Sequence, residues 1–289
     1  MKKKLLIKAV SLASAVIMGC MCFAGCGQQS TETASSDGPL TLDAIKAKGK
    51  LTVATEAAYE PFEYLDGDKI VGYNADLFAK ICEDLGVELD YIDLPFQGIL
   101  AGLDAKKYDM VGATLGVTAE RASKYTMTLP IENGTTVFVK RKGDDSINSI
   151  EDIGGKTIGT QTSCYNEDDT KKFNEKLISE GKEGYAQLLT YDSFPEAFME
   201  LKNGRIDLVA QNYASCASVI KNNPDDYEFV TGGGDKWVSW AVRKEDTELS
   251  DYINSEIKKF KEDGTMDELQ IKWFGETTDL PDSDYIPAE

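Results

Sequence analysis

The sequence predicts an α/β fold in two lobes, and three observations carry that prediction. Strand patterns alternate with helical patterns from about Leu40 onward, which is typical of parallel sheets flanked by helices. The alternation runs in two series, and the second begins near Ile150. Extended segments also lie where the chain could cross to the second lobe and return. Two crossings imply a two-strand hinge beside a cleft; one continuous domain is the alternative.

The first series begins at the start of the ordered chain. It holds strands and helices in alternation, at residues 51–55, 74–86, 87–92, 98–105 and 109–112. In the helix at 74–86, Leu77, Ile81 and Leu85 recur at i, i+4 and i+8, and Gly86 ends it. These segments predict one α/β lobe.

The second series repeats the alternation, at residues 156–160, 168–180, 194–203, 207–210 and 213–221. Residues 135–139 are expected to cross into this lobe. Glycines 232–234, followed by residues 238–242, are expected to cross back. A final helix then rejoins the first lobe, with Ile253, Ile257 and Phe260 in register.

These patterns set the expected domain boundaries. Residues 40–137 and 235–289 form the first lobe, and residues 138–234 form the second. Residues 26–39 are rich in Gln, Ser and Thr and predict a flexible tether. Residues 1–25 predict a signal peptide.

The N-terminus has the pattern of a secretory signal. Lysines precede a short apolar run at residues 9–18, and small residues precede Cys26. The run is too short to span a membrane. The small-small-Cys ending resembles the lipobox of bacterial lipoproteins, with Cys26 as the lipidated residue. Cys20 is a competing site, and cleavage near Ala24 without lipidation is a further alternative. Each version places the product outside the cytoplasm, and lipidation would anchor it to the extracytoplasmic face of the cell membrane.

Composition removes several classes of function. The formal net charge is −19, so nucleic acid is not an expected partner. The chain has no histidine, which excludes Ser-His-Asp and Cys-His catalysis and imidazole metal sites. We expect no metal and no cofactor. Cys82 is expected in the core, and Cys164 with Cys216 is predicted as a disulfide or a close pair.

Polar and aromatic side chains follow several strands at their carboxyl ends, where α/β sheets bind ligands. Arg121 is the strongest candidate for a ligand-binding residue, because a guanidinium matches a carboxylate in bidentate geometry. Thr114, Gly116 and Thr118 flank it with hydroxyls and accessible backbone. Residues 162–165 add amides before a helix, aimed at an anion. A surface salt bridge is the alternative role for Arg121.

Several motifs together resemble the extracellular solute-binding proteins of family 3, the polar amino-acid receptors of ABC importers. They are Ala58-Tyr-Glu-Pro-Phe62, Gly72-Tyr-Asn-Ala-Asp-Leu77, Thr118-x-x-Arg121, and Asp263-Gly-Thr with Lys272-Trp-Phe-Gly275. The resemblance covers roughly residues 40–275. It implies a type II periplasmic-binding-protein-like fold, in which each lobe is a sheet flanked by helices.

The resemblance also implies roles for individual residues. Arg121 falls on the arginine that clamps the ligand's α-carboxylate, and Thr114 and Gly116 fall on its neighbours. Tyr59 and Phe96 fall on the walls that sandwich the side chain. Glu56 falls on an acidic position at the end of the first strand. The loop of the second lobe that closes over the carboxylate is matched by Ser163, Cys164 and Tyr165.

Asn212 departs from the family pattern, which has an aspartate there to pair with the α-ammonium. Asn carries no charge, so Glu56 would have to compensate, or the solute is not a standard α-amino acid. Four aromatic residues could then box a methylated ammonium by cation–π contact, namely Tyr59, Phe96, Tyr165 and Tyr213. Their alternative role is that of plain apolar walls.

We therefore expect a monomeric receptor that binds an amino acid or amino-acid-like small solute in the cleft and delivers it to the permease subunits of an ABC importer. A receptor for a methylated ammonium or an organic acid is one alternative. An enzyme on the same scaffold, similar to dehydratases of prephenate-like acids, is the runner-up, with Glu56 as its general acid. A sensory ectodomain is a third reading. The identity of the solute stays open.

Overall fold

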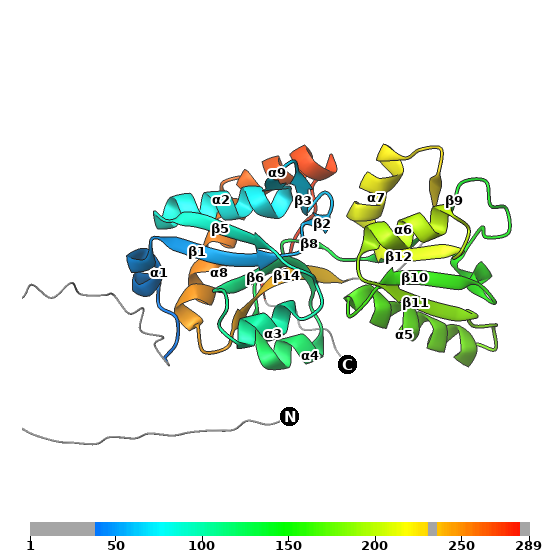
Figure 1. Cartoon of the computed structure of the whole chain (residues 1–289), viewed down its shortest axis with the longest axis horizontal. Coiled ribbons are helices and arrows are strands. Elements are labelled where there is room, and N and C mark those ends of the chain that lie inside the picture. The colour runs from blue at the N-terminus through cyan, green and yellow to red at the C-terminus, as the bar shows by residue number, and fades with distance from the viewer. Residues whose placement is uncertain (1–37, 231–235, 284–289) are drawn as a thin grey trace, which may run out of the picture. The chain divides into compact units, whose positions relative to one another are not determined.

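A computed structural model describes residues 38–230 and 236–283, which lie in one compact unit of the chain, Gly38–Glu289. The predicted signal peptide, most of the tether, Cys20, Cys26 and glycines 232–234 lie outside the described residues. The described part contains two main sheets, each flanked by helices (Figure 1).

The first sheet has the strand order β5-β1-β6-β14-β7, and β8 pairs with β14. Strand β1 is parallel to β5 and β6, whereas β14 is antiparallel to its neighbours. Its strands are β1 (Lys50–Thr55), β5 (Glu88–Asp93), β6 (Met110–Gly116), β7 (Tyr125–Met127), β8 (Glu132–Asn133) and β14 (Trp237–Arg243).

Helices cover both faces of this sheet, with α2 on one side and α3 on the other (Figure 1). Phe78 of α2 packs on Trp240 of β14 with ring centroids 4.2 Å apart, and both residues are fully buried. The helices are α1 (Leu42–Lys48), α2 (Tyr73–Leu85), α3 (Ile99–Asp104), α4 (Ala119–Lys124), α8 (Thr247–Glu262) and α9 (Thr265–Phe274).

The second sheet has the order β11-β10-β12-β9-β13. Strand β10 is parallel to β11 and β12, and β9 is antiparallel to β12 and β13. Its elements are β9 (Thr136–Arg141), the short 3₁₀ helix η1 (Ile150–Ile153), β10 (Thr157–Gln161), α5 (Tyr165–Ser179), β11 (Gln187–Tyr191), α6 (Phe194–Lys202), β12 (Leu208–Asn212), α7 (Tyr213–Asn222) and β13 (Tyr227–Val230).

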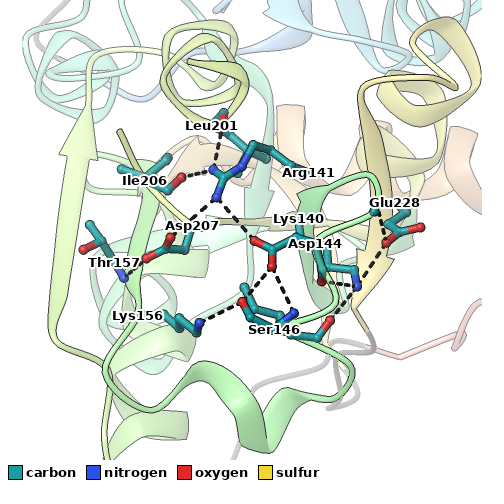
Figure 2. A network of polar contacts seen from close by, with 12 residues as sticks. Lys140, Arg141, Asp144, Ser146, Lys156, Thr157, Leu201, Ile206, Asp207 and Glu228 are labelled. Carbon is teal, nitrogen blue, oxygen red and sulfur yellow. Dashed lines mark hydrogen bonds and ion pairs between the residues drawn. The ribbon is translucent and has the colours of Figure 1, made fainter. Parts of the chain in front are cut away.

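A polar network fastens the far end of β9 to its neighbours (Figure 2). The Arg141 guanidinium donates to the carbonyl oxygens of Leu201 and Ile206 and pairs with Asp144 and Asp207. Beside it, Lys140 pairs with Glu228 of β13 at 3.0 Å. These bonds tie β9 to α6, to the turn after α6 and to β13.

The chain changes sheets between Asn133 of β8 and Thr136 of β9, and it has returned when β14 begins. Asp169 of α5 contacts both crossings, because it accepts a hydrogen bond from Thr136 Oγ1 at 2.7 Å and pairs with Lys236. The two-lobed α/β fold is confirmed by these sheets. The boundaries at 137/138 and 234/235, and the hinge motion, stay predictions.

Several predicted elements differ at their ends. Strand β6 runs to Gly116, four residues beyond the expected end, because Leu115 and Gly116 pair with β14. Helix α5 begins at Tyr165 rather than at residue 168, which gives its first turn two acidic residues that suit the helix dipole. The sequence patterns missed a small sheet of β2 (Ala58–Tyr59), β3 (Glu63–Asp66) and β4 (Lys69–Val71).

Candidate functional site

A small cavity lies where strands β1 and β6 end opposite the end of β10 and the first turn of α5. Its volume is about 10 Å³, which is room for one water molecule. Both main sheets contribute side chains to the wall, together with β2 and β3. The lining residues are Glu56, Tyr59, Glu63, Phe96, Ala113, Thr114, Gln161, Cys164, Tyr165, Asn166 and Phe194.

Glu56 carries one of two buried carboxylates in this wall. It follows β1 directly, and the Nε2 of Gln161, the last residue of β10, donates to both of its oxygens at 2.7 Å. Burial raises the pKa of Glu56 to about 7, and the hydrogen bond from Gln161 opposes that shift. The pair joins the two sheets inside the cavity.

Glu63 carries the second carboxylate and is 1% exposed. Its oxygens accept the Thr114 N–H at 2.8 Å, the Thr114 hydroxyl at 3.0 Å and the Asn74 amide at 2.6 Å. Burial nevertheless raises the pKa of Glu63 to about 8. Among the described residues, Glu63 has no cationic partner within ion-pair distance.

Arg121 lies beside the cavity on α4, whose N-terminus is capped by the Thr118 hydroxyl. Its guanidinium donates to the Gly116 carbonyl at 3.0 Å and to the Ser163 carbonyl at 3.1 Å, so it touches both lobes. It also lies 6.0 Å from the ring centroid of Phe96. Burial lowers its pKa, and within the described ranges no carboxylate forms an ion pair with it. Two of its five N–H donors are thus engaged, and the others are available to an anion.

Gly116 of the first lobe packs directly against the side chain of Tyr165 in the second. A Cβ atom added to Gly116 would lie 2.3 Å from Cγ of Tyr165, closer than any non-bonded contact allows. Tyr165 is buried and lines the cavity. The closed arrangement therefore requires glycine at position 116.

Asn212 ends β12 and is fully buried, but it does not line the cavity. Its side-chain oxygen accepts the N–H groups of Ala214 and Ser215 and so caps α7. Its amide donates to the Asn133 carbonyl at 3.0 Å and to the Tyr165 hydroxyl at 3.2 Å. In this arrangement the side chain is saturated by protein groups.

Two buried polar atoms of the cavity wall have no hydrogen-bond partner within residues 38–230 and 236–283. They are the Tyr59 hydroxyl and Oδ1 of Asn166. Buried groups of this kind are costly to leave unpaired. They are therefore positions at which a polar ligand would gain most from binding.

The structure brings together six of the ten predicted binding residues as cavity lining, namely Glu56, Tyr59, Phe96, Thr114, Cys164 and Tyr165. Gly116, Arg121 and Ser163 form a group beside the cavity, linked by the two Arg121 hydrogen bonds. Tyr213 is 46% exposed and stacks on Phe229. It is absent from the cavity wall, so the four-residue aromatic box is not assembled.

Sequence reasoning missed Glu63, Gln161, Asn166 and Phe194. Gln161 carried a usable signal, because it ends strand β10 just as Thr55 ends β1. Glu63 carried none, since an isolated glutamate in a short strand resembles a surface residue.

The predicted Cys164–Cys216 disulfide is wrong, because both thiols are free and buried. Each sulfur has its own polar neighbour: Cys164 Sγ lies 3.3 Å from Thr160 Oγ1, and Cys216 Sγ lies 3.9 Å from Gln211 Oε1. Cys82 is buried on α2, as expected. No group of acidic or cysteine side chains in the described part of the chain has the arrangement of a metal site.

None of the described helices combines the length and apolarity that crossing a membrane requires. Comparison with known proteins identifies the relatives of the chain. It is 33% identical to the L-cystine-binding protein TcyA of Bacillus subtilis (strain 168), over 96% of this chain and 98% of that protein.

Two solved structures share the fold. An ancestral arginine-binding protein bound to arginine has a TM-score of 0.70 and 35% identity, covering 78% of this chain and 99% of its own. The ancestral amino-acid-binding protein AncCDT-1, described as a precursor of cyclohexadienyl dehydratase, has a TM-score of 0.73 and 29% identity, covering 81% and 99%. The family model of the bacterial extracellular solute-binding proteins, family 3, matches residues 51–276, and the chain belongs to that family.

Proposed function

We propose that this protein is the solute receptor of an ABC importer and that it binds an amino acid between its two lobes. The single observation that carries the proposal is the cavity. Both sheets contribute residues to its wall, and there the buried carboxylate of Glu56 in the first lobe accepts hydrogen bonds from the amide of Gln161 in the second. The names of relatives support the solute class, because they include cystine-binding and arginine-binding proteins.

The groups around the cavity suit the two charges of an amino acid. Arg121 offers free N–H donors to a carboxylate, and the first turn of α5 adds backbone amides. Glu56 offers a carboxylate to an ammonium that would displace the Gln161 amide. Tyr59, Phe96 and Phe194 supply the apolar walls. Because 10 Å³ cannot hold an amino acid, binding requires the lobes to separate and close again around the solute.

Calorimetric titration and thermal shift test this proposal. The ligands are the common amino acids together with L-cystine, glycine betaine and small organic acids as comparison classes. At 100-fold the dissociation constant a ligand stabilises the protein by about 2.7 kcal/mol, which a thermal shift resolves easily. Binding of betaine or organic acids alone would overturn the amino-acid reading.

An enzyme is the second candidate, and one observation favours it. Glu56 lines the cavity, is 9% exposed and has its pKa raised to about 7 by burial, which is the property of a general acid near neutral pH. AncCDT-1 shows that a binding protein of this fold can stand at the origin of a dehydratase. Incubation of the protein with prephenate, followed by spectroscopic detection of phenylpyruvate, tests it. Turnover that Glu56→Gln abolishes would support the enzyme.

We further propose that Cys26 carries the lipid anchor and that the closed form docks on the permease as a monomer. The N-terminal sequence pattern supports the anchor, and family membership supports the docking. Mass spectrometry of the mature N-terminus tests the anchor, since an acylated Cys26 must be its first residue. An unmodified N-terminus near residue 25 would overturn it.

A further inference from the structure

Glu60 joins the two lobes at a point outside the cavity. Its Oε1 accepts a hydrogen bond from Ser218 Oγ at 3.0 Å and a second from Asn222 Nδ2 at 3.0 Å. Ser218 and Asn222 lie one turn apart on α7, so they present both donors on the same helix face. Glu60 belongs to the first lobe, and α7 belongs to the second.

Open space borders this contact on both sides. One groove of about 720 Å³ and another of about 430 Å³ are each lined by Glu60 and Tyr64 from the first lobe and by residues of α7 from the second. The half-buried Glu60 side chain thus spans a gap between the lobes. Within the described part of the chain it makes no ion pair, so its carboxylate depends on these two donors.

The backbone that carries Glu60 is held firmly. Tyr59 lines the cavity on one side of it, and Phe62 is fully buried in the core on the other. The Phe62 N–H donates to the Tyr59 carbonyl at 2.9 Å, and the Pro61 carbonyl accepts from Tyr73 N–H at 3.0 Å. Glu60 can therefore keep its contact with α7 only while the two lobes lie together.

From this geometry we propose that Glu60 is a positioning residue that latches the closed form and thereby sets the affinity for the solute. The inference rests on the proposed solute-binding function. The two hydrogen bonds exist only when the lobes are together, so they lower the free energy of the closed form alone. A contact made in one of two states shifts the equilibrium between them and changes the apparent affinity by the same factor.

The decisive measurement is calorimetric titration of L-arginine and L-cystine, with stopped-flow dissociation kinetics. The full-length variants are Glu60→Ala, Glu60→Gln, Asn222→Ala and the double variant Glu60→Ala/Asn222→Ala. We expect Glu60→Ala to weaken binding by about 5- to 10-fold, given the usual contribution of hydrogen bonds to a charged group and the partial exposure of this one. The loss should lie in a faster dissociation rate, because the latch forms after the solute has entered.

The matched control is Asp66→Ala, which removes an exposed carboxylate from the same small sheet and should leave affinity unchanged. Glu60→Gln keeps an acceptor oxygen and should recover part of the loss. The double variant should bind no more weakly than Glu60→Ala, because the second substitution removes a donor whose acceptor is gone. Additive losses, or an unchanged dissociation rate in Glu60→Ala, would overturn the latch.

The two proposals fail in different ways. If the wild-type protein binds no amino acid, the proposed function is wrong. The latch is then judged by small-angle scattering without solute, where Glu60→Ala must have a larger radius of gyration than the wild type. Equal radii in that experiment would remove the latch as well.

Discussion

The side-chain nitrogen of Gln161 lies 2.7 Å from each carboxylate oxygen of Glu56. One amide of the second lobe thus covers a buried carboxylate of the first. An amide dipole is a weak partner for a buried charge, as the raised pKa of Glu56 indicates. A ligand cation placed there would form a stronger pair, and the expected competition between Gln161 and ligand underlies the first prediction.

Glu56→Gln is expected to weaken binding of an amino acid by about 10- to 100-fold, because the ligand ammonium loses its charged partner. Asn212→Asp is expected to weaken binding, because its carboxylate can still cap α7 but cannot donate to the Asn133 carbonyl, which lies 3.0 Å from the amide nitrogen that it replaces. Calorimetry on both variants checks this. Full affinity in Glu56→Gln would mean that the solute places no ammonium against Glu56.

Arg121→Ala is expected to cost about 3 kcal/mol of binding free energy, roughly a 100-fold change in dissociation constant, because a buried ligand carboxylate would go unpaired. The far-ultraviolet circular dichroism should not change. Arg205→Ala is the matched control, because Arg205 is exposed and pairs only with Glu200 among the described residues. Equal affinities of the two variants would exclude Arg121 as the anion clamp.

Gly116→Ala is expected to block full closure, since the new methyl group would overlap the buried ring of Tyr165. Overpacking of this kind costs about 1–3 kcal/mol, so affinity should fall roughly 10-fold. Small-angle scattering at saturating ligand should show a larger radius of gyration than the wild type. Gly38→Ala is the control, because nothing lies within 4 Å of the atom added there. A variant that closes fully would show that the hinge prediction or the contact is wrong.

The buried carboxylates predict a falling stability between pH 5 and 8. Burial raises the pKa of Glu63 from 4.5 to about 8, so the folded state binds a proton that the unfolded state has released. The free energy of unfolding therefore decreases as the pH rises through this window, by at most about 1.4 kcal/mol per pH unit for one proton. The raised pKa of Glu56 contributes to the same decrease in the free energy of unfolding up to about pH 7.

Glu63→Gln should flatten this dependence in urea unfolding at pH 5, 6, 7 and 8. The glutamine can still accept the Thr114 N–H, and a rotated Asn74 amide could accept from it, because Oδ1 of Asn74 has no partner among the described residues. Glu83→Gln, an exposed site on α2, is the control and should keep the wild-type slope. An unchanged slope in Glu63→Gln would show that its carboxyl titrates normally.

The alternation of patterns was sufficient to predict both lobes, because helices such as α2 carry a regular apolar stripe from Leu77 to Leu85. The end of β6 could not be predicted, since Gly116 becomes part of a strand only by pairing with Val238, far along the chain. The strands β2 and β3 are only two and four residues long, and they pack against α6 and α2, which no local sequence pattern reveals.

The site residues also divide into those that the sequence could predict and those that it could not. Glu56 and Arg121 could be selected because charged residues at strand ends stand out. Glu63 could not, because its role depends on the Thr114 backbone N–H, which no sequence pattern reveals. Asn212 was expected to face the ligand, and the structure instead uses every donor and acceptor of its amide within the protein.

Strand β14 has a consequence for how the chain is made. It lies between β6 and β7, so the interior of the first sheet stays open until residues 237–243 have been synthesised. The strands of the second sheet, by contrast, are continuous from Thr136 to Val230. Domains usually fold from the N-terminus as they emerge from the ribosome. Here the order is reversed: the lobe that begins first is completed last, and two edges of its sheet stay unpaired until β14 joins them.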